Sequence, residues 1–176
     1  MYFIRVRFAI SWLKHLNSLD IIKLGQSMTS CPFCDIVHGT GPVSLVYEDD
    51  LTMAFIPLQP IYPGACIVIP KVHIDHFTDL PDELAVRIMV VSQRIGRKIM
   101  EVYQPLKVGM VVHGFGVRHA HMNLIPQHDP LDITYKHLAH IEDGAVKFSE
   151  KHLPELSRKE LDELADSLRI SEIATS

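Results

Sequence analysis

The sequence predicts an α+β fold in which short strands form a mostly antiparallel sheet that helices cover. Apolar runs bounded by turn residues predict strands at 44–48, 51–56, 65–70, 106–112 and 119–125. Apolar residues at intervals of three or four then indicate one face of a long helix: Leu84, Ile88, Val91, Ile95 and Ile99. Because strands outnumber helices and the links are short, antiparallel pairing is favoured.

Three details complete the predicted elements. Asp49 and Asp50 separate the first two apolar runs, which indicates the turn of a β-hairpin. Asp79 is expected to cap the long helix, with Pro81 in its first turn. A second, shorter helix is expected over residues 157–168, where leucines return at helical spacing.

The 176 residues suit one compact domain with extensions at both ends. We expect an N-terminal extension at 1–27, a domain at 28–150 and a C-terminal helical tail at 151–176. The basic, amphipathic extension is compatible with an organelle transit peptide or a surface-binding helix. An upstream translated extension, with the working domain starting near Met28, is favoured over both. No apolar run reaches the roughly 20 residues that span a bilayer.

Charge and cysteine content restrict the setting and the partners. The net charge of −4 argues against a nucleic acid partner held by general electrostatic attraction. Three cysteines, an odd number, indicate a reduced, cytoplasmic setting, where the pair Cys31 and Cys34 is metal-binding or redox-active rather than a structural disulfide. Cys66 lies in an apolar run and is expected to be a small buried side chain.

The segment 119–125 carries the candidate chemistry. Alternate side chains of a strand share a face, so His119, His121 and Asn123 are expected on one face, with Ala120 and Met122 toward the core. A solvated edge strand is the alternative explanation for three polar groups on one side. An imidazole is substantially neutral at pH 7 and can attack an electrophilic phosphorus to give a covalent phosphoramidate.

Four segments in order resemble the histidine-triad (HIT) family. They are Cys31-Pro-Phe-Cys34, then residues 47–55, 67–73 and 109–126. The last contains His119-Ala-His121-Met-Asn123, which is similar to the family signature of three histidines separated by apolar residues. The resemblance covers roughly residues 30 to 130.

This resemblance implies a five-stranded antiparallel sheet with one long and one shorter helix, usually paired into a homodimer. It implies binding of a purine nucleotide or nucleotide conjugate. The implied activity is hydrolysis of nucleotide phosphoanhydrides or phosphoramidates, of the dinucleoside polyphosphate or nucleoside phosphoramidate type. By position, His121 would be the nucleophile that carries the nucleotidyl group, and His119 the first triad member.

The resemblance also implies a structural zinc site, made by Cys31, Cys34, His73 and His119. Two thiolates and two imidazoles close a tetrahedral site and leave no position open for catalysis. The alternatives for the CxxC pair are two unrelated thiols and a redox dithiol, which belongs at a helix start in a thioredoxin-like βαβ unit. His76 is expected at the surface.

The sequence departs from the family at Asn123, whose amide cannot exchange a proton near neutral pH. Related nucleotidyltransferases and phosphorylases carry Gln there, so Asn123 favours transfer to an acceptor other than water. Pro57, which replaces an acidic residue expected at the ribose, and a shortened glycine-rich loop favour a weakly active nucleotide-binding protein. Candidate substrate contacts are His113, Arg118 and Asn123, although Arg118 is equally compatible with a solvent-facing position.

The remaining histidines are expected outside the site. His128 is expected to be a loop residue, with a proton-transfer role beside Asp129 as the alternative. His137, His140 and His152 are expected at the surface.

Overall fold

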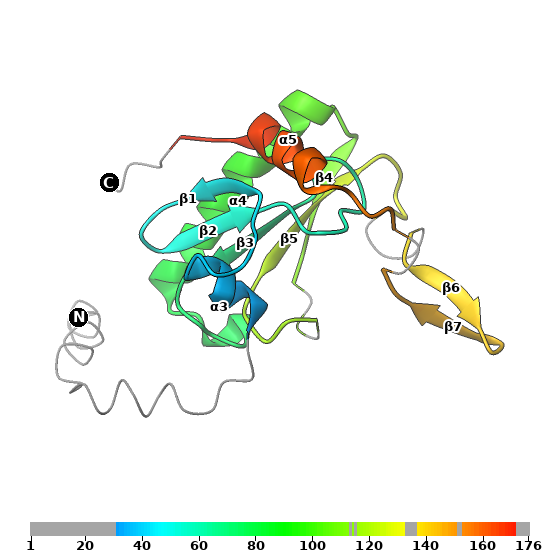
Figure 1. Cartoon of the computed structure of the whole chain (residues 1–176), viewed down its shortest axis with the longest axis horizontal. Coiled ribbons are helices and arrows are strands. Elements are labelled where there is room, and N and C mark those ends of the chain that lie inside the picture. Colours follow the sequence, from blue (N-terminus) through cyan, green and yellow to red (C-terminus); the bar gives the residue numbers. More distant parts are fainter. Residues whose placement is uncertain (1–30, 113, 115, 133–136, 151–152, 172–176) are drawn as a thin grey trace, which may run out of the picture. The chain divides into compact units, whose positions relative to one another are not determined.

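The computed structural model describes residues 31–112, 114, 116–132, 137–150 and 153–171. This part contains the expected five-stranded antiparallel sheet, with the strand order β1-β2-β3-β5-β4 (Figure 1). The strands are β1 (Leu45–Glu48), β2 (Thr52–Phe55), β3 (Cys66–Pro70), β4 (Lys107–Val111) and β5 (Met122–Gln127). The expected hairpin is confirmed, because β1 and β2 pair antiparallel across the acidic turn.

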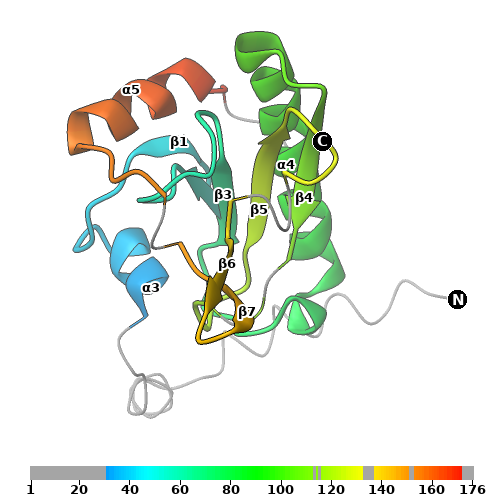
Figure 2. The ribbon, with the colours of Figure 1, turned by 90° about the vertical axis from the view of Figure 1, so that its right-hand side faces the viewer.

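Helices cover both faces of this sheet. They are α3 (Pro32–Val37), α4 (Asp82–Tyr103) and α5 (Arg158–Leu168), with a 3-10 turn η1 (Phe77–Asp79) before α4. Figure 2 shows α3 and α4 on opposite sides of the sheet, and α5 contacts β1 and α4. None of the helices described is long and apolar enough to cross a membrane.

Strand alternation divides the interior into two clusters. Ala54 and Val68 turn toward α4 and α5, in the larger cluster of buried side chains. Their neighbours Phe55 and Ile69 turn the other way and pack with Phe33 of α3 in a smaller cluster. Every residue of β2 and β3 is therefore buried, since each face of these strands is covered by a different helix.

The long helix α4 shows both a confirmed and a wrong prediction. All five apolar residues of its predicted stripe are buried. Asp79, however, does not cap the helix: it ends η1, and α4 begins three residues later at Asp82 with Pro81 at its N-cap. The reason is local, because a proline disfavours helical geometry in the residue before it, and Leu80 is accordingly extended.

The second helix, α5, is also confirmed. Its capping box joins Ser157 and Glu160: the Ser157 Oγ accepts from the Glu160 N–H at 3.3 Å, and the Glu160 carboxylate accepts from the Ser157 N–H at 2.7 Å. Leu161 and Leu168 are buried in the larger cluster. The helix is therefore packed into the interior, although it belongs to the segment expected as a tail.

The turn between β1 and β2 is tied to α4 by a half-buried ion pair. Arg87 lies 2.6 Å from the Asp49 carboxylate, which also accepts from the Tyr47 hydroxyl and from the backbone N–H groups of Leu51 and Thr52. Burial alone would raise the pKa of Asp49, but these hydrogen bonds outweigh it and lower the pKa to about 2. The carboxylate is thus ionised at neutral pH and helps to fix the hairpin on the helix.

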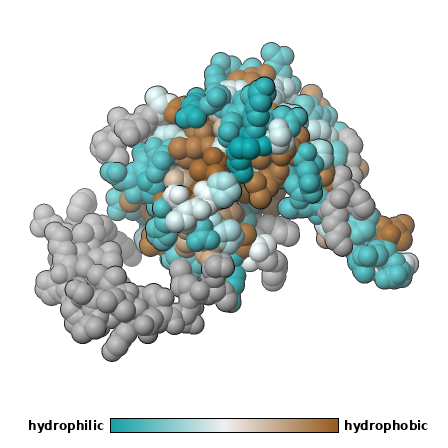
Figure 3. All heavy atoms as spheres, viewed as in Figure 1, coloured by the Kyte–Doolittle hydropathy of each residue, from teal (hydrophilic) through white to brown (hydrophobic). Residues whose placement is uncertain are grey.

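A second hairpin, absent from the sequence prediction, is formed by β6 (Ala139–Glu142) and β7 (Ala145–Phe148). Asp143 and Gly144 connect them, and both have positive φ, as a two-residue hairpin turn requires. Ile141 pairs with Val146 on its apolar face, and these side chains are 79% and 65% exposed. Figure 3 shows apolar atoms at the hairpin among hydrophilic neighbours.

Candidate functional site

The cysteine pair lies on the short helix α3. Cys31 is its N-cap and makes no side-chain capping bond, and Cys34 lies in its first turn. Both thiols are buried. A redox pair also occupies a helix start, but in a βαβ unit, whereas the sheet described here is antiparallel throughout.

Four potential metal ligands meet between α3, the segment after β3 and the segment before β5. The ligand atoms of Cys31, Cys34, His73 and His119 all lie within 4.8 Å of one another. The Nδ1 of His119 is 3.6 Å from one sulfur and 3.7 Å from the other, and the Nδ1 of His73 is 3.2 Å from the Cys34 sulfur. Tetrahedral zinc with ordinary bond lengths separates a sulfur and a nitrogen by about 3.6 Å. The spacing and the donor set therefore fit this metal.

His119 is held from both sides of its ring. Its Nε2 donates to the Pro70 carbonyl at 2.8 Å, so the unprotonated Nδ1 faces the thiols. In proteins, a metal-bound imidazole is fixed by a hydrogen bond of this kind from the ring nitrogen that does not bind the metal. Burial lowers the pKa of His119, and the neighbouring rings of His73 and His121 act in the same direction, although the Pro70 bond opposes them.

Burial also governs the cysteines. Together with the neighbouring Cys31 thiol, it raises the pKa of Cys34 to about 11, so a metal cation would have to displace a proton to bind there. Cys66 is 1% exposed within β3, and burial raises its pKa as well. The expectation that Cys66 is a small buried side chain is confirmed.

The prediction that the strand starts at His119 is wrong, because β5 begins at Met122. Pro70, at the end of β3, has no N–H to continue the ladder, and its carbonyl accepts from the His119 ring. The backbone of 119–121 bonds elsewhere instead: the Ala120 N–H donates to the Ile74 carbonyl at 2.6 Å. Even so, Ala120 and Met122 turn into the larger cluster as expected.

His121 is oriented by its own backbone. Its Nδ1 donates to the His119 carbonyl at 2.7 Å, which leaves a lone pair on Nε2. The side chains of His119 and His121 are both buried, with 0% and 9% of their surfaces exposed. A solvated edge strand, the alternative explanation for this pattern, is therefore incorrect.

Asn123, the third polar residue, is half-buried. Its amide donates to the carbonyl of Val111 on the neighbouring strand β4, at 3.4 Å. This bond directs the amide nitrogen toward β4, and an amide has no proton that it can give up near neutral pH.

Phe33 is a site residue that the sequence analysis missed. Its ring makes edge-to-face contacts with the imidazoles of His119 and His121, with ring centroids 5.8 and 5.4 Å apart, and with Phe55. The available signal was its position inside the CxxC segment. In the sequence, however, Phe33 looks like an ordinary apolar residue until α3 is placed over the histidines.

Other predicted site residues lie apart from this cluster. Arg118 is 82% exposed and its Nε donates to the Asp75 carboxylate at 3.1 Å, so its contact with a phosphate stays a prediction. His113 lies outside the described residues. His76 caps η1 at the surface, as expected, and is not among the four clustered ligands.

The structure corrects the prediction for two of the distant histidines. His128 is an exposed loop residue, as expected, and its ring lies against Tyr62. His137, expected at the surface, is half-buried instead: its Nε2 lies 2.8 Å from the Tyr62 hydroxyl and 3.6 Å from the buried Asp132 carboxylate. His140 is half-buried too, and His152 is outside the described part of the chain.

Comparison with known proteins identifies the family. A model of the HIT domain matches residues 39–129, just over half of the chain. The chain belongs to the HIT family. This confirms the resemblance, and the match ends at Asp129, so the β6–β7 hairpin and α5 lie beyond the matched segment.

Relatives of this HIT domain include the protein Hit of Bacillus subtilis, which is 33% identical over 104 residues, 56% of this chain and 72% of the relative. An adenosine 5'-monophosphoramidase of Schizosaccharomyces pombe is 35% identical over 100 residues, 56% of this chain and 74% of that protein. A solved structure of a Zn-bound histidine triad family protein from Mycobacterium smegmatis has a TM-score of 0.57 at 25% identity. The superposition covers 79% of this chain and 95% of the Mycobacterium smegmatis chain.

Proposed function

We propose that this HIT domain is a hydrolase of nucleotide phosphoanhydrides or phosphoramidates that works through a nucleotidyl intermediate on His121. One contact carries the proposal: the Nδ1 of His121 donates to the His119 carbonyl, which leaves the lone pair of Nε2 available as the nucleophile. The relative described as an adenosine 5'-monophosphoramidase supports a purine nucleotide conjugate as the substrate.

Both chemical steps balance without a metal at phosphorus. The Nε2 lone pair of His121 forms a bond to the α-phosphorus, and the bond to the leaving oxygen or nitrogen breaks with its electron pair. Water then forms a bond to phosphorus, the P–N bond breaks and restores the lone pair, and the proton of water passes to solvent. In this scheme His119 acts through its backbone carbonyl, which keeps the proton of His121 on Nδ1.

Asn123 decides which leaving groups suit the site. A phosphate departs as a stable anion, whereas the amine of a phosphoramidate must gain a proton as it departs. Since the amide of Asn123 cannot supply that proton, phosphoanhydrides of the dinucleoside polyphosphate type are the better substrates within the proposed class.

The same residue favours a second candidate, nucleotidyl transfer of the phosphorylase kind, in which phosphate or a sugar phosphate replaces water. The third candidate, a weakly active nucleotide-binding protein, rests on Pro57 and the short loop before His119. Contacts of His113, Arg118 and Asn123 with substrate belong to all three candidates.

We further propose that Cys31, Cys34, His73 and His119 hold one structural zinc. Four protein ligands leave no open position, so the ion would fix α3 to the sheet and take no part in the chemistry. The Zn-bound relative from Mycobacterium smegmatis supports the choice of metal. The free thiols of the described chain support a reducing, cytoplasmic setting.

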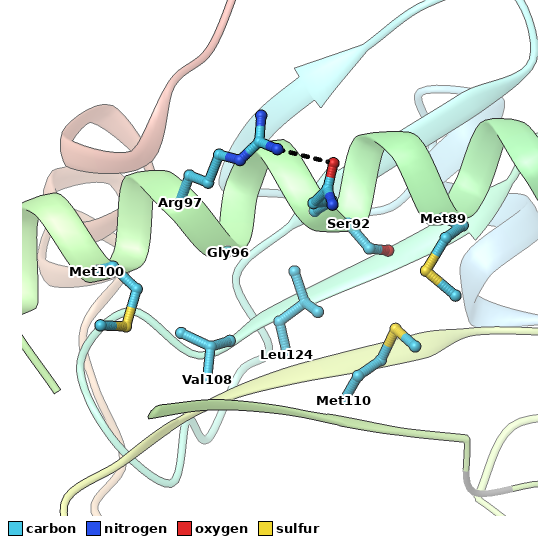
Figure 4. A pocket seen from close by; sticks show the side chains of 9 residues that line it. Met89, Ser92, Gly96, Arg97, Met100, Val108, Met110 and Leu124 are labelled. Carbon is cyan, nitrogen blue, oxygen red and sulfur yellow. Dashed lines mark hydrogen bonds between the residues drawn. The ribbon is translucent and has the colours of Figure 1, made fainter. Parts of the chain in front are cut away.

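Finally, we propose that two copies pair through β4. This strand is at the edge of the sheet, and a groove of about 380 Å³ runs between it and α4. Figure 4 shows methionines of both elements pointing into the groove: Met89, Met100 and Met110. These side chains are between 41% and 49% exposed.

A second copy suits this groove better than a small ligand does. An exposed strand edge invites pairing with another strand, and an antiparallel β4–β4 contact about a two-fold axis would place each groove against the other. Gly96, which has no side chain, leaves room on the helix side of the groove. The partner copy would cover this part of the groove.

Prediction on the intermediate. Incubation of the full chain with a panel of dinucleoside polyphosphates and nucleoside phosphoramidates should add the mass of one nucleoside monophosphate to the peptide with His121. Mass spectrometry under neutral or basic conditions detects it, because phosphohistidine bonds are labile in acid. His121→Gln should abolish adduct and turnover, whereas His128→Gln should keep both.

Turnover by His121→Gln at the wild-type rate would exclude the mechanism. Loss of the adduct that is faster with added phosphate or sugar phosphate than in water would select transfer over hydrolysis. Binding measured by calorimetry without adduct or turnover on the whole panel would select the weakly active binding protein.

Prediction on the leaving group. Asn123→His should raise phosphoramidate hydrolysis at least about tenfold relative to phosphoanhydride hydrolysis, because an imidazole can protonate the departing amine. The measurement is the ratio of kcat/KM for two substrates that share one nucleotide. Asn123→Gln, which keeps an amide, should leave the ratio unchanged, and an equal rise for both substrates would contradict the argument.

Prediction on the metal. The purified protein should contain about one zinc per chain, since the four ligands form one tetrahedral site. Cys34→Ser should reduce zinc to a small fraction and lower the thermal midpoint, while Cys66→Ala should keep full zinc occupancy. Elemental analysis and thermal unfolding provide the readouts, and full zinc in Cys34→Ser would reject this ligand set.

Prediction on assembly. The protein should sediment as a dimer at micromolar concentration, and Met110→Lys should shift it to monomer, because a charge would be buried against the partner's groove. Analytical ultracentrifugation gives the mass. Val146→Lys, at an exposed apolar position on the β6–β7 hairpin, is the control and should remain dimeric. A wild-type monomer would reject the interface.

A further inference from the structure

Phe33 comes between the two cysteines in the sequence, and its ring packs against the imidazole proposed to react. It stands two residues after Cys31 and one before Cys34, on the single turn of helix that carries both. Its ring meets His121 at 83° with centroids 5.4 Å apart, and it meets His119 at 71° and 5.8 Å. The ring is 8% exposed, so it excludes water from that side of both imidazoles.

The hydrogen bond to the His119 carbonyl does not by itself fix the His121 ring. One bond sets the direction of Nδ1, but the ring can still pivot about it, because the outer torsion of a histidine side chain is broad. An aromatic ring packed at a right angle removes this freedom. Phe33 thereby determines where Nε2, at the far side of the ring, is aimed.

The position of Phe33 in turn depends on the cysteines. The helix α3 has six residues and no side-chain cap at its N-terminus, and a helix this short is not stable alone. Beyond the small apolar cluster it shares with β2 and β3, its anchors are the two sulfurs beside His73 and His119. Whatever joins these four groups fixes α3, and with it the ring.

We propose that Phe33 is a positioning residue, through which the ligation of Cys31 and Cys34 controls the orientation of the nucleophile His121. The inference deepens the proposed function and rests on it. It explains how a metal without an open coordination position affects the reaction: α3 transmits ligation to the reacting ring through an aromatic contact. Phe33 itself transfers no proton and forms no bond.

The first test observes the ring directly and needs no substrate. NMR spectra of the full chain with labelled histidine report the shifts of the His121 ring, assigned by comparison with His121→Gln. Phe33→Leu should move these signals, because it removes the ring current and the fixed orientation. Removal of zinc from the wild type should move them in the same direction. Met53→Leu, a conservative change in the same cluster, is the control and should leave them in place.

The second test measures how fast the His121 adduct forms in a single turnover. Phe33→Leu with full zinc content should lower the maximal rate constant about tenfold, since small displacements of a reacting group have large effects on rate, while KM changes less. Zinc removal from the wild type should cause a similar loss. Zinc removal from Phe33→Leu should add less than about twofold, because both changes act through one contact.

The outcomes separate this inference from the proposed function. Unmoved His121 signals in Phe33→Leu, or losses that multiply independently, would overturn the role of Phe33 even if the adduct forms normally. A wild-type protein that forms no adduct would reject the proposed function, and the spectra would still decide whether Phe33 orients the ring. If Phe33→Leu does not fold, Phe33→Met provides the same comparison with an unbranched side chain.

Discussion

The fully buried side chain of His119 is the constraint on which the site depends. One ring nitrogen faces two thiols, the other donates to the Pro70 carbonyl, and the backbone carbonyl of the same residue accepts from His121. A buried imidazole must satisfy both nitrogens, so it has one acceptable position. The His119 carbonyl, which orients His121, is therefore placed by the side chain of His119 itself.

The groups that hold this segment in place differ from the group that is proposed to react. The groups that fix the segment are the Pro70 carbonyl, the thiols and the ring of His119. The amide of Asn123, by contrast, donates to the Val111 carbonyl on β4. This bond is separate from those that hold His119 and His121, and an amide at this position cannot exchange a proton near neutral pH.

The sequence predicted those elements whose signal is periodic. The stripe on α4 and the alternation around Ala120 identify the core because burial is repeated over many residues. Boundaries set by a single backbone group were missed. Leu80 is extended because Pro81 follows it, so α4 begins only at Asp82, and Pro70 offers no N–H to the neighbouring strand, so β5 begins only at Met122. Asp143-Gly144 is a hairpin signal that was available in the sequence.

The site was predictable in its residue types but not in its contacts. Spacing alone indicated His119, His121 and the CxxC pair, since metal ligands and reacting groups come from a short set of residue types. No pattern could place Phe33, because its contacts join residues almost ninety positions apart and depend on a helix of six residues. Nor could a sequence pattern reveal that Arg118 pairs with Asp75, since a charged side chain in a loop has no preferred orientation.

Strand β4 connects the edge of the sheet with the proposed reacting centre. Val111, whose carbonyl accepts from Asn123, pairs with that residue in the ladder, and the next residue along β4 toward the groove is Met110. An edge strand with one free side is held by half as many ladder bonds as a central one. In the proposed dimer both sides of β4 would be bonded, which would steady Val111 and, with it, the amide at the third triad position. A residue that cannot move a proton can still align a substrate, but only if its own acceptor stays fixed. In the proposed dimer, assembly and Asn123 would thus be linked through one backbone carbonyl.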